Sequence, residues 1–162
     1  MLTAEELKRH LHYDPETGQF TRLIKLRGIK SGNGYTHSTG YVRICVLGRK
    51  YPAHRLAWLY VYGEWPETIL DHINGDKADN RISNLRKSNV TLNVQNQRRA
   101  MSTNTIGVLG VCVMKDRKRK KPYQARIGVD GKSIYLGYYA TPEEAHEAYK
   151  TAKRNYHAGC TI

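Results

Sequence analysis

Cysteine and long apolar runs are both scarce in this sequence. Its three cysteines, Cys45, Cys112 and Cys160, are far apart and form no Cys-x-x-Cys pair. An odd number of isolated thiols argues against a disulfide framework or a cysteine zinc site, and it favours a reducing, cytosolic setting. No apolar run approaches the length of a membrane span, and the first ten residues lack the apolar core of a signal peptide. We therefore expect a cytoplasmic protein with no membrane partner.

Acidic residues are also few. The chain has 27 Lys and Arg against 14 Asp and Glu, a net charge of +13, and residues 98–162 are more basic than residues 1–97. A charge of this size informs about partners rather than fold, and nucleic-acid phosphate is the commonest large anion. The plainer alternative is a solubilising excess of charge. The length of 162 residues, 40% of them hydrophobic, suits one ordinary domain or two small ones.

The first half of the chain predicts short helices and strands. Thr3 opens a Thr-x-x-Glu capping box, which predicts a brief helix. Residues 41–47 alternate and are rich in β-branched side chains, so they predict a strand, and Gly48 turns the chain into a return strand. Residues 54–63 fit a short helix that ends at its glycine. A further strand leads into residues 69–72.

The second half predicts a sheet and a closing helix. Ser88 suits the N-cap of a helix over about residues 89–99, and residues 100–107 are small and polar, as in a linker. The Asp-Gly pair at 130–131 is a hairpin signal. The remaining predicted elements are strands over 110–114, 123–129 and 133–139, and a helix that begins after Thr141 and ends at Gly159.

The stretch "ILDHINGDKADNRISNLRKSNVTLNVQNQ" (69–97) combines an Asp-His pair with many asparagines. Phosphodiester hydrolysis needs a base that activates water and a cation that stabilises charge on the phosphate. A neutral His is a suitable base near pH 7, and a hard divalent ion takes carboxylate and amide oxygens. A strand, loop, strand and helix in this order can bring Asp71, His72 and Asn93 together around one metal.

The spaced set "DHINGDKADNRISNLR" with a downstream Asn resembles the HNH (His-Me finger) endonucleases, particularly the phage and intron-borne type. In that family a ββα unit holds one divalent cation, so the resemblance implies a Mg²⁺ or Mn²⁺ cofactor. It implies His72 as general base, Asp71 as metal ligand and Asn84 as the residue that holds the loop orienting the base. Asn93 would be the second ligand, where many relatives have His. Asn96 competes with it, because the helix register is open.

Several of these residues have plainer interpretations. An isolated Asp-His pair is common, and a lone His at a strand end is more often structural; the spacing of the whole set carries the resemblance. His54 lies in "YPAHRLAW", which is similar to the segment before the finger in the phage type. It is either structural, or it supports the site or contacts phosphate. Arg86 is predicted to contact DNA. Asn74, Asn80 and Asn89 are expected to be turn or cap residues.

The densest basic run is "KDRKRKKPYQAR" (115–126), between two predicted strands. Alone it suggests a solvated loop or a localisation signal. A twisted three-stranded sheet can also lie in the DNA major groove. With "GV" (110–111), "YQARI", "YLGYYATPEEAHEAY" and the closing helix, the region resembles the ethylene-response-factor (APETALA-type) DNA-binding domain. That resemblance implies that the sheet reads DNA while the helix supports it. The implied DNA-binding residues are Arg117, Arg119, Tyr123, Arg126, Lys132 and Tyr135.

Together these features predict an α+β protein with two modules. Residues 1–99 would form an HNH nuclease domain, with a β-meander before a finger at about 66–99, and residues 100–107 a linker. Residues 108–160 would form an APETALA-type domain, a three-stranded antiparallel sheet packed on one helix. The predicted function is one-metal cleavage of double-stranded DNA by a homing-type endonuclease, phage-encoded and acting in a bacterial cytoplasm, as a monomer or alternatively a dimer. The main alternative is a non-catalytic, sequence-specific DNA-binding protein with a degenerate finger. An RNA-binding module is disfavoured, because the aromatic strand motif of RNA-recognition sheets is missing.

Overall fold

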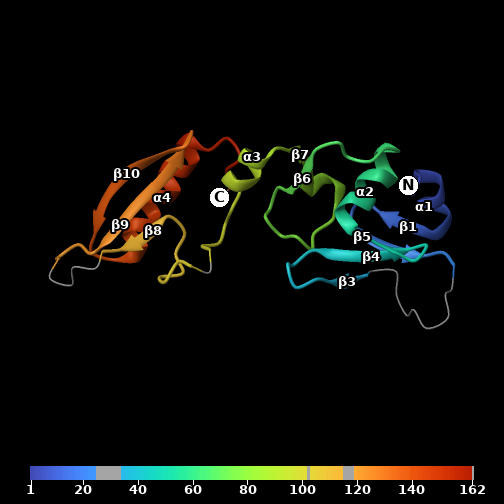
Figure 1. The fold of residues 1–162 in the computed structure, drawn as a ribbon, viewed down its shortest axis with the longest axis horizontal. Coiled ribbons are helices and arrows are strands. Elements are labelled where there is room, and N and C mark those ends of the chain that lie inside the picture. The colour runs from blue at the N-terminus through green and yellow to red at the C-terminus, as the bar shows by residue number, and fades with distance from the viewer. Residues whose placement is uncertain (25–33, 102, 115–118, 162) are drawn as a thin grey trace. The chain divides into compact units, whose positions relative to one another are not determined.

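The computed structural model describes residues 1–24, 34–101, 103–114 and 119–161, and the chain divides into two compact units, Met1–Asn89 and Val90–Ile162. Both are drawn in Figure 1. The first unit contains α1 (Ala4–His10), β1 (Leu11–Asp14), β2 (Gln19–Arg22), β3 (Tyr35–Thr36), β4 (Val42–Val46), β5 (Arg49–Pro52), α2 (Ala53–Tyr62), β6 (Ile69–His72), the 3₁₀ turn η1 (Ile82–Asn84) and β7 (Leu85–Ser88). The second contains α3 (Val90–Gln95), β8 (Val111–Val113), β9 (Tyr123–Val129), β10 (Lys132–Tyr139) and α4 (Pro142–Tyr156). The fold is of the predicted α+β class, with small antiparallel sheets.

Local sequence signals set the ends of the elements in the first unit. Thr3 and Glu6 form the predicted reciprocal capping box at the start of α1. The turn between β4 and β5 places Leu47 and Gly48 at positive φ, as a tight hairpin requires. Gly63 has a left-handed conformation and ends α2, also as predicted.

One apolar cluster holds the first unit together. It draws on α1, α2 and three of the small sheets, so each short element is stabilised by its neighbours rather than by its own length. Its largest buried side chains are those of Leu7, Leu11, Tyr13, Phe20, Ile44, Val46, Leu56 and Leu59. The β6–β7 hairpin joins this cluster through Leu85.

The second unit is a three-stranded antiparallel sheet in the order β10-β9-β8, and α4 covers one of its faces (Figure 1). Side chains alternate between the two faces of β9. Ala125 and Ile127 are buried in the two apolar clusters that include Ala145 and Tyr149 of α4. Arg126, the residue between them, therefore lies on the opposite, open face. The predicted Asp130-Gly131 hairpin is present, with both residues at positive φ.

Three local predictions differ from the structure. The helix after Ser88 covers only Val90–Gln95, and Ser88 itself ends β7, where its hydroxyl donates to the carbonyl of Asn89. The closing helix ends at Tyr156, because His157 has extended backbone, so Gly159 does not cap it. Gly159 is instead packed so tightly that a Cβ there would lie 2.5 Å from the carbonyl oxygen of Leu92.

None of the described helices is long and apolar enough to cross a membrane.

Gly110 and Gly131 provide a matched test of packing in the second unit. Both have left-handed backbone, with φ of 77° and 76°, but a Cβ at Gly110 would lie 2.0 Å from the ring of Tyr149, whereas none of the described atoms lies within 4 Å of a Cβ at Gly131. Gly131→Ala should cost about 1–2 kcal/mol of backbone strain. Gly110→Ala should cost about 1–3 kcal/mol more from overpacking. Urea unfolding of both variants measures the difference, and equal losses would contradict this account of the interface between β8 and α4.

Candidate functional site

The β6–β7 hairpin positions the Asp-His pair. In its antiparallel register Asp71 lies opposite Arg86, and His72 lies opposite Leu85. The acidic residue and the histidine are both buried, with 5% and 3% of their surface exposed. Arg86 donates from Nε (3.1 Å) and Nη2 (2.8 Å) to Oδ2 of Asp71. Arg86 thus supplies the charged hydrogen-bond partner that a buried carboxylate needs at this position.

Asn84 closes the loop between the two strands. Its Oδ1 accepts from the backbone N–H of Asn74 (2.9 Å), and its Nδ2 donates to the backbone oxygen of Asp79 (2.9 Å). The N–H of Ile73 also donates to the carbonyl of Asn84 (2.9 Å). These bonds tie both ends of the loop that begins directly after His72 to one buried residue.

Asp79 stabilises the same loop through its side chain. Its carboxylate accepts from Nη2 and Nε of Arg81 and from Nδ2 of Asn74. The hydrogen bonds from Arg81, with a smaller contribution from Asn74, lower the pKa of Asp79 to about 2. The carboxylate is therefore ionised at any physiological pH, and the loop keeps these hydrogen bonds.

His72 lies in an aromatic setting. Its ring centroid is 5.2 Å from that of His54 in an edge-on arrangement, and 5.9 Å from that of Tyr41. The ammonium of Lys77 lies 4.8 Å over the ring of Tyr41 and donates to the carbonyl of Thr39 (3.1 Å). Thus the loop after β6 is linked to the segment before β4, and Tyr41 contacts both Lys77 and His72.

Burial keeps both imidazoles neutral. It lowers the pKa of His54 to about 3, and the proximity of His72 adds to this shift. Burial also lowers the pKa of His72, although a hydrogen bond with the Asn80 side chain and the charge of Asp71 oppose the shift. A neutral imidazole at pH 7 is the protonation state that a general base requires.

The predicted metal ligands fall in different units. Asp71 belongs to the first unit, whereas Asn93 is exposed on α3 of the second, so their pairing stays a prediction. Asn96 is buried, and its Oδ1 accepts from Oγ1 of Thr161 (2.6 Å). Among the described residues no group of three or more His, Cys, Asp or Glu side chains is able to hold a metal. One carboxylate, supplemented by amide, water and phosphate oxygens, fits a hard cation such as Mg²⁺, which keeps several waters.

The open face of the second sheet carries most of the described candidate DNA-binding residues. Arg126 pairs in register with Tyr135, which is 52% exposed. The guanidinium of Arg119 lies 5.1 Å over the ring of Tyr138 on the same face. Lys132 is exposed beside the hairpin turn. Tyr123 lies on the other face, partly buried against the cluster below α4. Arg117 lies outside the described residues.

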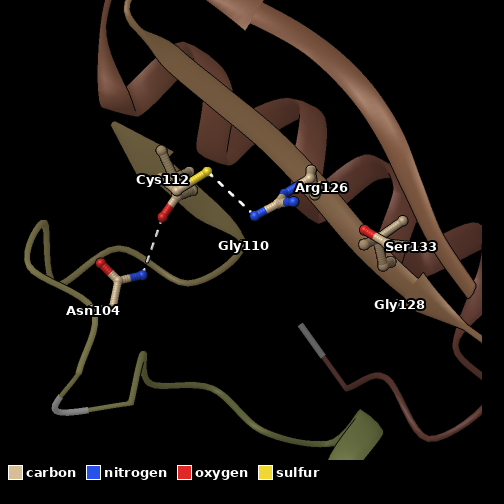
Figure 2. Close-up of a pocket in the computed structure, with 8 residues that line it drawn as sticks. Asn104, Gly110, Cys112, Arg126, Gly128 and Ser133 are labelled. Atoms are coloured by element: carbon tan, nitrogen blue, oxygen red, sulfur yellow. Dashed lines mark hydrogen bonds between the residues drawn. The ribbon is translucent and has the colours of Figure 1, made fainter. Parts of the chain in front are cut away.

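A shallow pocket of about 410 Å³ opens beside these residues (Figure 2). Cys112 of β8 and Arg126 of β9 point toward each other at its wall, with Sγ and Nη2 3.7 Å apart. Asn104 lines another side, and its Nδ2 donates to the carbonyls of Val108 and Val111. The guanidinium is thus the cationic group of a hollow on the open face.

Three residues of the site carry contacts that the sequence does not predict. The sequence indicates Tyr41 only as a strand residue, it indicates no role for Lys77, and it predicts Asn80 as a turn residue. Asn80 is buried, and its backbone oxygen accepts from the hydroxyl of Tyr13 (2.8 Å). Local patterns do not predict these contacts, since they join segments that are distant in the chain.

The central part of the chain is similar to a known protein family. Residues 51–94 match the family model of the HNH endonucleases, and this range contains Asp71, His72, Asn84 and Asn93. The chain is also similar to one in a solved structure of DNA binding and cleavage by the HNH homing endonuclease I-HmuI, with 27% identity and a TM-score of 0.42. That alignment covers 54% of this chain and 51% of the other, about half of each. No curated protein matches the chain.

The buried His54 predicts a pH dependence of stability. Its pKa is about 3 in the folded protein against an ordinary value of 6.5, so only the unfolded chain binds its proton between these values. Stability should therefore fall as pH drops below 6.5, by about 2 kcal/mol at pH 5 from this residue alone. Urea unfolding at pH 7 and pH 5 tests this, with His54→Phe as the variant that lacks the titrating group. An identical loss on acidification in both proteins would rule out His54 as a source.

Proposed function

We propose that this chain is a divalent-metal-dependent HNH endonuclease that hydrolyses phosphodiester bonds in double-stranded DNA, of the homing type carried by phages or other mobile elements. The observation that carries the proposal is the position of Asp71 and His72. They end β6 inside the segment that matches the HNH family, and Asn84 holds the following loop through bonds to Asn74 and Asp79. The basic second unit supplies a surface suited to the DNA substrate.

His72 is the proposed general base. A water oxygen attacks the phosphorus while the imidazole accepts the water proton, and the P–O3′ bond breaks as the 3′ oxygen leaves. The lowered pKa of His72 supports this role, because the ring is able to accept a proton at neutral pH. The products would carry 5′-phosphate and 3′-hydroxyl ends. Since His72 is only 3% exposed, the reaction requires the residues that bury the imidazole to move when DNA binds.

Asp71 and Asn93 are the proposed metal ligands, with Mg²⁺ or Mn²⁺ as the ion. When bound, the cation supplies positive charge beside the phosphate and the leaving oxygen. Asn93 is favoured over Asn96 because its side chain is exposed on α3, whereas Asn96 is buried against Thr161. Arg86 holds Asp71 through Oδ2, and on this proposal it fixes the carboxylate beside the phosphate, where its charge also favours DNA.

The second unit is the proposed DNA anchor. Arg119, Arg126 and Tyr135 lie together on the open face of its sheet, the combination of charge and aromatic surface that nucleic acids favour. Tyr123 packs on the supporting face and is the weakest of the candidate readers. On this proposal residues 108–160 hold the duplex while residues 1–99 cleave it, by a monomer that nicks one strand.

The competing function is that of a DNA-binding protein with an inactive finger. The burial of His72 is the observation that favours it. Both functions require salt-sensitive DNA binding, but only the nuclease requires metal-dependent strand cleavage.

The proposed chemistry predicts nicking that depends on His72. Purified protein should convert supercoiled plasmid to open circles with Mg²⁺ or Mn²⁺ and not with EDTA. His72→Ala should slow this by about 10²- to 10⁴-fold, since the general base is lost. His12→Ala, at an exposed histidine of β1, is the matched control and should retain the rate. An unchanged rate in His72→Ala would refute the assignment, and DNA binding without any cleavage of phage, host or plasmid DNA would favour the inactive finger.

The proposed anchor predicts that the open face governs affinity. Arg126→Ala should weaken DNA binding and reduce the slope of log affinity against log salt by about one, since one phosphate contact is lost. Arg154→Ala, at an exposed arginine on α4, is the matched control and should leave both unchanged. Gel-shift titrations at three salt concentrations measure the effect, and a larger loss in Arg154→Ala would place the DNA surface on the helix instead.

A further inference from the structure

The short helix α3 cannot be stable by its own interactions. It has six residues, none of them buried, and isolated helices of this length are unstable in water. Its position must therefore be set by contacts with other segments. This matters for the proposed function, which the following inference rests on, because α3 carries Asn93.

A segment after α4 supplies such contacts. We call residues 157–161 the clasp. The N–H of Gly159 donates to Oε1 of Gln95 (3.1 Å), and Oγ1 of Thr161 donates to Oδ1 of Asn96 (2.6 Å). These two bonds reach the last residue of α3 and the residue that follows it.

The clasp also fits α3 sterically. Gly159 is buried, and a Cβ there would lie 2.5 Å from the carbonyl oxygen of Leu92 and 3.1 Å from Cβ of Gln95. No positive φ requires glycine at this position, so the close approach to the helix is the reason that a side chain does not fit. The sequence suggests a helix cap here, whereas the structure shows a contact surface.

Two basic side chains strengthen the same junction. Nη2 of Arg98 donates to the carbonyl oxygen of Thr161 (2.9 Å) and contacts its hydroxyl. Lys153 of α4 is buried, and its ammonium donates to the carbonyl of Gln97. Thus the residues directly after α3 are held from both the clasp and the closing helix.

The clasp is joined at its other end to the sheet. Nε2 of His157 donates to the carbonyl of Gly128 in β9 (2.7 Å), and Gly128 lines the pocket in Figure 2. The clasp therefore connects the strand that lines this pocket to α3. All of these residues belong to the second unit.

We propose that the clasp is a positioning device for the nuclease: it holds α3, and with it the metal ligand Asn93, on the DNA-binding unit. The ligand would then be held by the same unit that carries the proposed DNA-binding face. Thr161 and Gly159 are its positioning residues, and neither contacts the reacting groups.

Thr161→Val tests the inference, because it removes the hydroxyl that donates to Asn96 and keeps the shape of the side chain. Amide hydrogen exchange over residues 90–96 should become faster by about tenfold, the effect of one hydrogen bond to a buried amide. The Mn²⁺ concentration for half-maximal nicking should rise by about the same factor, whereas the rate at saturating Mn²⁺ should recover. DNA binding in EDTA should be unchanged.

Three further variants complete the design. Thr161→Ser keeps the hydroxyl and should behave as wild type. Thr151→Val makes the same exchange on α4, where the hydroxyl donates to Glu147 within the helix, and should change nothing. Gly159→Ala should exceed the effect of Thr161→Val, because its Cβ displaces the clasp from Leu92.

The outcomes separate the clasp from the proposed function. Unchanged exchange in both Thr161→Val and Gly159→Ala would overturn the clasp, as would faster exchange with an unchanged Mn²⁺ requirement. If the wild-type protein cuts no DNA with any metal, the proposed nuclease fails, and the exchange data still decide whether the clasp holds α3.

Discussion

The buried side chain of Asn84 is the interaction on which the rest of the candidate site depends. A loop of polar residues between two short strands has no core of its own, and Asn84 replaces that core with two hydrogen bonds that reach opposite ends of the loop. Each of these bonds gives a hydrogen-bond partner to a backbone group of the loop that would otherwise need one from water. As a result, the loop that follows the four-residue strand β6 is held at both of its ends.

Burial sets the protonation state of the two histidines and also makes the folded protein less stable in acid. Removing His54 and His72 from water keeps both rings neutral, and it makes the fold sensitive to acid. Asp71 carries a negative charge that Arg86 compensates across the hairpin. The site is therefore a closed arrangement of neutral rings and a paired carboxylate, and catalysis would require DNA to replace part of that arrangement.

The second unit is a small sheet with one covered and one open face. One face packs Ala125 and Ile127 against α4, which leaves the other face to carry Arg126 and Tyr135. The clasp, which follows α4, contacts the end of the six-residue α3. The division of the chain at Asn89 thus does not follow the boundary of the HNH match, which continues to residue 94.

The sequence by itself determined most of the elements and located the candidate site. The helix caps at Thr3 and Thr141, the Asp-Gly hairpin and the alternation in β9 follow from local rules, and each is present. The spaced Asp, His and Asn set indicates the nuclease from sequence alone, since motif spacing is local information. Tertiary structure alone decided the rest. Tyr41 and Lys77 beside His72, Arg86 on Asp71 and the contact of Gly159 with Leu92 join positions distant in the chain, and such contacts depend on packing, which no local pattern encodes.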